Sequence, residues 1–107
     1  MQKDVVTVVI EVRAQPGLGE LLRAELSALA RVVVAQEPDC LGIEMLQGED
    51  DDTRVLLYER WTSRAAYTGP HTRTPHMLAF MQKAPAFAAG APTITFWRTT
   101  ENLSSQR

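Results

Sequence analysis

Two histidines, a glutamate and several aromatic residues lie close together in the stretch ERWTSRAAYTGPHTRTPHMLAF, which runs from Glu59 to Phe80. His71 and His76 are the two histidines of the whole chain. Imidazole is the side chain whose charge changes nearest neutral pH, and a neighbouring carboxyl group can share a proton with it. These residue types therefore favour acid and base chemistry beside an aromatic surface.

The glutamate lies on an apolar strand face. In RVLLYERW, alternate residues point to the same side, which places Glu59 with Val55, Leu57 and Trp61. A carboxylate in such surroundings needs a partner or a shifted pKa. We expect a salt bridge to an arginine, and a role in proton transfer is the second interpretation.

Either histidine could act as a general base. His76 falls at the second position of a helix that Thr74 caps and Pro75 opens, where the helix dipole favours a neutral imidazole that can accept a proton. Capping of this helix by His76 is an equally good interpretation. His71 lies in the preceding loop, where functional groups are over-represented but surface histidines are also common.

Four further residues are candidates for substrate binding. Trp61, Tyr67 and Phe80 could form the walls of a pocket for a planar substrate, with Met77 as another contact. Aromatic residues at the ends of helices and strands more often pack in the core. The two interpretations are compatible, because a core residue can also line a cavity.

Several classes of protein are disfavoured. Two histidines five residues apart do not share a helical face, and no carboxylate pair is spaced to complete a ligand set, so we expect no metal. The absence of a GxSxG motif argues against a serine hydrolase. No GxGxxG or P-loop motif is present to bind a nucleotide, and we expect no cofactor. A net charge of -2 argues against a nucleic-acid partner.

The remaining composition is that of a cytoplasmic protein without a membrane partner. No apolar run approaches the roughly 20 residues that span a bilayer, and the N-terminus lacks the pattern of a signal peptide. A single cysteine, Cys40, excludes an intrachain disulfide, and we expect it to be a small buried residue.

The elements that must position the candidate residues follow from hydrophobic periodicity and turn signals. They are a strand over 5–14, a helix from Leu18 to before Pro38, a strand from Leu41, a strand over 54–61, a short helix RAAYT capped by Ser63 and ended at Gly69-Pro70, a helix from Thr74 that Pro85 kinks or ends, and a strand TITFWRTT.

This order is typical of an α+β fold, the ferredoxin-like split βαβ arrangement with an antiparallel sheet and helices on one face. We expect one domain over 1–100 and a flexible tail over 101–107. The second sheet face carries apolar residues that a chain of 107 residues leaves uncovered, so we expect a homodimer.

Several of these residues together resemble the antibiotic biosynthesis monooxygenase (ABM) family, and among its members the small quinol monooxygenases. The resemblance runs from about Val5 to Arg98 and rests on EVRAQPG, EPDCLG, ERW and PHTRTPHM followed by Phe80. It implies a dimeric α+β barrel with a pocket between sheet and helices. The loop before His71 is one residue longer than the family pattern, with Gly69-Pro70 as the insertion, and Asp39 replaces a glycine.

The resemblance implies a cofactor-independent monooxygenase that oxidises a quinol or polyphenolic substrate with molecular oxygen. A base beside a dry aromatic pocket would make such a substrate easier to oxidise. His76, His71 and Glu59 are the catalytic candidates. Haem degradation is disfavoured, because Ile10, His71 and Met81 match the positions where that branch has Asn, Trp and His. An isomerase for a small carbonyl signalling compound and a non-catalytic dimeric module that binds an aromatic ligand are the alternatives.

Overall fold

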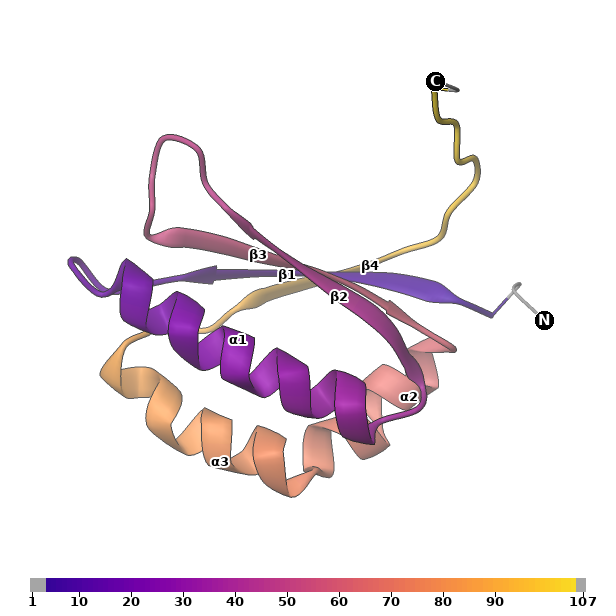
Figure 1. Cartoon of the computed structure of the whole chain (residues 1–107). Helices are drawn as coiled ribbons and strands as arrows, with labels where there is room; N and C mark the ends of the chain where they lie inside the picture. Colours follow the sequence, from indigo (N-terminus) through magenta and orange to yellow (C-terminus); the bar gives the residue numbers. More distant parts are fainter. Residues whose placement is uncertain (1–3, 106–107) are drawn as a thin grey trace.

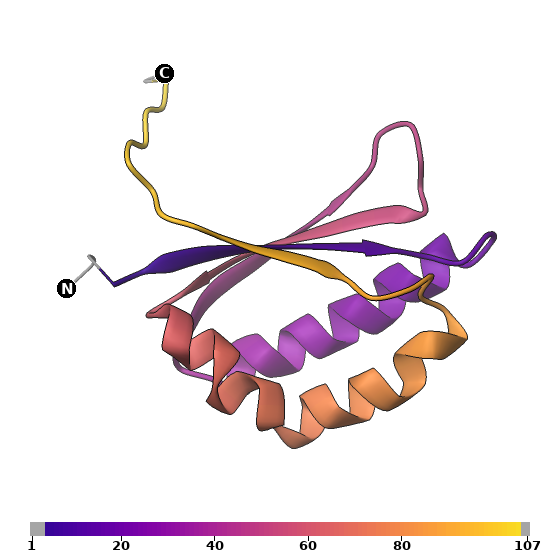
Figure 2. The same cartoon turned by 180° about the vertical axis from the view of Figure 1, so that it is seen from behind.

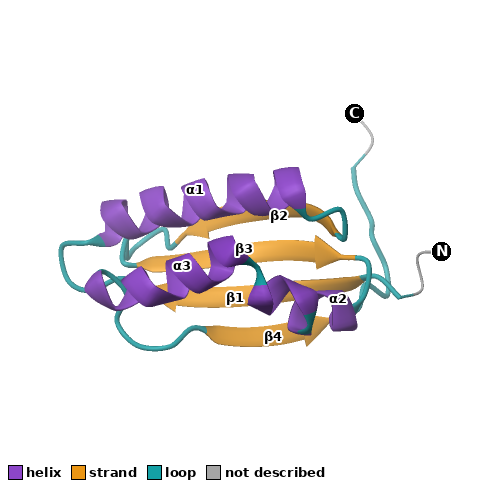
Figure 3. Ribbon diagram, turned by 90° about the horizontal axis from the view of Figure 1, so that it is seen from below, coloured by secondary structure: helices purple, strands orange, loops and turns teal. Residues whose placement is uncertain are grey.

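A computed structural model describes residues 4–105 and shows the predicted order of elements. Four antiparallel strands form one sheet in the order β2-β3-β1-β4. The helices lie on one face of this sheet, which confirms the ferredoxin-like α+β fold (Figures 1 and 3). The elements are β1 (Val6–Arg13), α1 (Gly19–Gln36), β2 (Cys40–Gln47), β3 (Arg54–Trp61), α2 (Arg64–Thr68), the 3-10 helix η1 (Pro70–Arg73), α3 (Pro75–Lys83), the 3-10 helix η2 (Ala84–Ala86) and β4 (Thr93–Trp97).

The two-residue period of the central strands decides which side chains face the helices. Val8 pairs with Glu59, and Ile10 pairs with Leu57, so these residues share one face of the sheet. All four are buried beneath the helical layer. The predicted apolar face of β3 is therefore confirmed, with Glu59 in the middle of the core layer.

The helix boundaries follow the predicted caps and proline positions. The Ser63 side chain accepts a hydrogen bond from the Ala66 backbone, and the Thr74 side chain accepts one from the Met77 backbone. Helix α1 ends at Gln36, two residues before Pro38, and α3 ends at Lys83. Both stops lie where the sequence predicted them. Glu37, before Pro38, is extended, because proline disfavours helical geometry in the residue before it. Ala84, before Pro85, keeps helical backbone angles, and the chain continues there as the 3-10 helix η2.

Two segments differ from the prediction. The last strand ends at Trp97 instead of continuing to Thr100, because Trp97 pairs with Thr7 and β1 begins at Val6. Residues after Arg98 therefore have no strand to pair with. His71, predicted in a loop, lies in η1 and is buried. Residues 101–105 form neither helix nor strand, and the remainder of the predicted tail, 106–107, lies outside the described residues.

The second face of the sheet has no helix over it (Figure 2). Val9 and Leu56 are partly buried there, whereas Tyr58 is 41% and Trp97 58% exposed. A homodimer that covers this face stays a prediction. In the described part of the chain, no helix is long and apolar enough to cross a membrane.

Candidate active site

A cavity of about 570 Å³ lies between the sheet and the helices. Its volume is within the usual range for a site that holds a small organic ligand. Along β1 it extends from the level of Glu59, which pairs with Val8, to Val12, a span of about 13 Å at roughly 3.3 Å per residue. Five predicted site residues line it: Glu59, Tyr67, His71, Met77 and Phe80.

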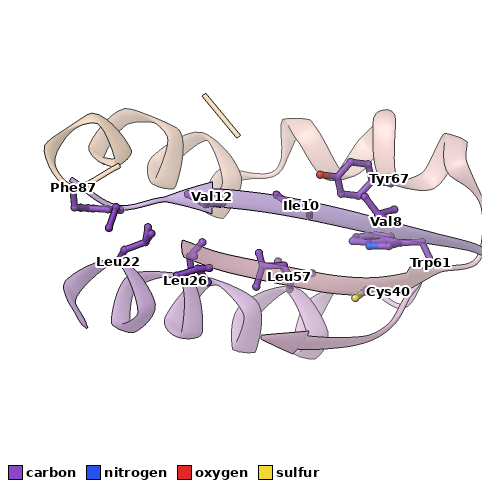
Figure 4. Close-up of a cluster of buried hydrophobic side chains, with 13 residues drawn as sticks. Val8, Ile10, Val12, Leu22, Leu26, Cys40, Leu57, Trp61, Tyr67 and Phe87 are labelled. Atoms are coloured by element: carbon purple, nitrogen blue, oxygen red, sulfur yellow. The ribbon is translucent and has the colours of Figure 1, made fainter. Parts of the chain in front are cut away.

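Most of the cavity is apolar, and its ionisable groups lie toward one end. Val12 and Leu26 come from the end where Leu22 and Phe87 pack, whereas Tyr67 lies near Val8 and Trp61 (Figure 4). Glu59, Tyr67 and His71 are the titratable residues among those lining the cavity. The arrangement suits a ligand with an apolar body and a polar group at one end.

Glu59 is buried, with 5% of its surface exposed, and the Trp61 indole Nε1–H donates a hydrogen bond of 2.9 Å to its Oε1. Burial raises the pKa of Glu59 to about 7, with the Trp61 hydrogen bond opposing this rise and the charge of Glu37 adding to it. The carboxyl group can therefore keep its proton up to neutral pH.

The predicted salt bridge from Glu59 to an arginine is wrong. The ion pairs found among residues 4–105 do not include Glu59. Strand alternation points the adjacent Arg60 to the opposite face of the sheet, while Trp61 shares the face of Glu59. The indole is therefore the donor within reach.

His71 is enclosed by aromatic rings and by a carboxylate. Its side chain is 4% exposed, and its ring centroid lies 4.6 Å from that of Trp61 and 5.0 Å from that of Tyr67. Burial lowers the pKa of His71, and the hydrogen bond and charge of Glu37 oppose this effect. The ring is therefore held in surroundings that favour its neutral, proton-accepting form.

Glu37, which follows the last turn of α1, is a site residue that the sequence did not reveal. Its carboxylate oxygens lie 3.0 Å from His71 Nδ1, and Oε2 lies 2.6 Å from His76 Nε2. It is thus the link between the two histidines. One weak signal for Glu37 was its position directly before Pro38, where the helix must end.

Trp61 and His76 lie behind the cavity instead of in its lining. Trp61, predicted as a wall, is 1% exposed and contacts both Glu59 and His71. His76 lies in the first turn of α3, as predicted, with its side chain 15% exposed and its Nε2 directed to Glu37. Neither is among the residues that line the cavity.

Cys40 is buried, as the sequence predicted, and burial raises the pKa of its thiol to about 11. It is therefore held as a thiol at neutral pH. Within residues 4–105, no group of three or more His, Cys, Asp or Glu is arranged to hold a metal ion.

The fold and the site together place this chain among the small α+β proteins that have a ferredoxin-like sheet and an apolar cavity beneath their helices. At one end of the cavity lie the buried ionisable residues Glu59 and His71. More particularly, the sequence profile of the antibiotic biosynthesis monooxygenase family matches residues 5–83, and the chain belongs to this family. The resemblance that the sequence predicted is confirmed. No curated protein sequence matches the chain.

Solved structures share the fold over nearly the whole chain. PA3566 from Pseudomonas aeruginosa is 26% identical, with a TM-score of 0.82 over 94% of this chain and 99% of that one. Rv0793 from Mycobacterium tuberculosis is 23% identical, with a TM-score of 0.78 over 94% and 99%. A variant of SnoaB, described as a cofactor-independent oxygenase from Streptomyces nogalater, is 18% identical, with a TM-score of 0.79 over 95% and 99%.

Proposed function

We propose that this protein is a cofactor-independent monooxygenase that oxidises a quinol or another polyphenolic aromatic substrate with molecular oxygen. The observation that carries the proposal is the apolar cavity with His71 and Glu59 at one end. Membership of the monooxygenase family and the description of SnoaB as a cofactor-independent oxygenase support it.

The cavity favours a neutral substrate with a flat apolar body. Phe80, Met77 and Ile10 offer apolar surface on both the helical and the sheet side. The residues that line the cavity, all within the described chain, include no lysine or arginine. A phosphorylated or carboxylated compound would leave its charge unpaired there. An aromatic hydroxyl group directed at His71 satisfies the polar end.

In the proposed reaction His71 removes the proton of an aromatic hydroxyl group. The resulting anion is electron-rich and transfers electrons to oxygen more readily than the neutral substrate. One oxygen atom replaces a ring hydrogen and becomes a new carbonyl, and the deprotonated hydroxyl group becomes a second carbonyl. The other oxygen atom leaves as water with the ring hydrogen and the proton that His71 removed. The substrate loses four electrons, which is the number that reduces O₂ to these two products, so no external reductant is needed.

Protonated Glu59 has the complementary role. As a neutral acid it donates a hydrogen bond to a substrate oxygen, while the Trp61 indole holds its other oxygen. A second carboxylate charge beside the substrate anion would oppose deprotonation, and the raised pKa of Glu59 avoids that charge up to about pH 7.

Oxygen uptake with a panel of benzene, naphthalene and anthracene quinols tests the proposal, with the reaction without protein subtracted. We expect uptake equal to product formed, and one labelled atom in each product when isotope-labelled oxygen is supplied. Hydrogen peroxide in equal amount would indicate a simple oxidase. Tight binding without uptake would indicate the binding module, and turnover without oxygen the isomerase.

A further inference from the structure

Glu37 is held in place by its backbone at the end of α1. Its N–H donates to the Val33 carbonyl at 2.8 Å, and its own carbonyl accepts from the Cys40 N–H at 3.0 Å. The side chain is 12% exposed and reaches two histidines from a different part of the chain. Because both backbone polar groups of Glu37 are hydrogen-bonded, its carboxylate is held in a defined position relative to the two imidazole rings that it contacts.

The contacts with an ionised Glu37 indicate which nitrogen of each ring carries hydrogen. A carboxylate only accepts hydrogen bonds, so each ring nitrogen that faces Glu37 carries hydrogen. For His71 this nitrogen is Nδ1, at 3.0 Å, which leaves the lone pair on Nε2. For His76 it is Nε2, at 2.6 Å. His71 also lines the cavity, whereas His76 does not.

We infer that Glu37 is a positioning residue that fixes His71 as the Nδ1–H tautomer with its basic Nε2 free for the substrate, and that His76 acts by holding Glu37. The assignment of a base to His71 rests on the proposed function, whereas the tautomers do not. When His71 accepts a proton, the new charge lies 3.0 Å from the Glu37 carboxylate. That pairing stabilises the protonated base in surroundings that otherwise disfavour it.

Nitrogen-detected NMR of the isotope-labelled protein tests the tautomers directly, because the chain has two histidines and one substitution assigns both signals. At about pH 8, above the ordinary range of imidazole, we expect His71 protonated on Nδ1 and His76 on Nε2. Glu37→Gln should convert His71 to a mixture of tautomers. Glu20→Gln is the control, because it removes the same charge from an exposed residue of α1. It should leave the tautomers of both histidines unchanged.

The kinetic arm uses oxidation of a dihydroxynaphthalene. Glu37→Gln should lower kcat at least about tenfold with little change in KM, because the base is misoriented while the cavity is intact. Wild-type His71 with hydrogen on Nε2 would overturn the inference, as would a Glu37→Gln protein with unchanged His71 tautomer. If Glu37→Gln does not fold, the wild-type tautomer decides. Absence of oxidation with the expected tautomers would refute the proposed function and leave the assignment of Glu37 standing.

The pH dependence gives a second readout. The titratable groups around His71 are Glu37, His76, Glu59 and Tyr67. Because Glu37 raises the pKa of His71 against the effect of burial, Glu37→Gln should move the His71 titration to lower pH. A residue with only a structural role would leave that titration in place once the protein is folded.

Discussion

Glu59→Gln should make the protein less sensitive to pH between about pH 4.5 and 7. The pKa of this carboxyl group is 4.5 in its ordinary state and about 7 in the folded protein, chiefly because it is buried. A raised folded pKa means that Glu59 contributes most stability below pH 4.5, where both states hold the proton. That contribution is lost as the pH rises toward 7.

The size of the effect follows from the shift. A difference of roughly 2.5 pKa units at about 1.4 kcal/mol per unit corresponds to about 3 to 4 kcal/mol, of which about 3 kcal/mol develops between pH 4 and pH 8. Solvent screening reduces this little, since 5% of Glu59 is exposed. Glutamine has the same shape, and its carbonyl keeps an acceptor for the Trp61 indole, so the substitution removes ionisation and little else.

Urea unfolding of the wild-type and Glu59→Gln proteins at about pH 4 and pH 8, at one protein concentration, measures the difference. Between pH 4 and pH 8, the free energy of unfolding of the variant should rise by about 3 kcal/mol relative to that of the wild type. Other titrating groups cancel in this comparison. If the two proteins differ in free energy of unfolding by the same amount at both pH values, the reasoning is refuted, and Glu59 titrates normally in the folded state.

Three further predictions concern the base, the pH profile and assembly. His71→Gln should lower turnover roughly a hundredfold or more, the scale of a general base. His76→Gln should lower it much less, because its amide can still donate to Glu37; a larger loss of oxygen uptake in His76→Gln would indicate His76 as the base. The turnover profile should rise through the lowered pKa of His71 and fall near pH 7 as Glu59 ionises, and the falling limb should vanish in Glu59→Gln. Light scattering at micromolar concentration should give twice the 11.9 kDa chain mass, and Tyr58→Glu on the open sheet face should give monomer; a wild-type monomer would argue against the dimeric barrel.

The fold could be predicted because its signals are local. The two-residue period of β1 and β3, the Ser63 and Thr74 caps and the prolines at the helix ends each involve residues close together in the sequence. The same holds for the placement of Glu59 on an apolar face. The family resemblance predicted a pocket between the sheet and the helices, and the structure has a cavity at that place.

The partners of the ionisable groups could not be predicted, because they depend on tertiary contacts. Glu37 meets His71 and His76 across separations of 34 and 39 residues. Nothing in local periodicity relates a helix end to a later 3-10 helix. The same limit explains why an arginine was expected beside Glu59, since strand alternation fixes the face of a side chain but leaves open which donor reaches it.

Burial shifts the two groups at the cavity end in opposite directions, and this connects the fold to the proposed chemistry. Removing water disfavours the charged form of each, which raises the pKa of Glu59 and lowers that of His71. At neutral pH the cavity can therefore hold a neutral acid beside a neutral base. Such a site receives an uncharged quinol without a desolvated ion pair and develops charge only when the proton moves. At that moment Glu37, 3.0 Å from His71, supplies the matching charge.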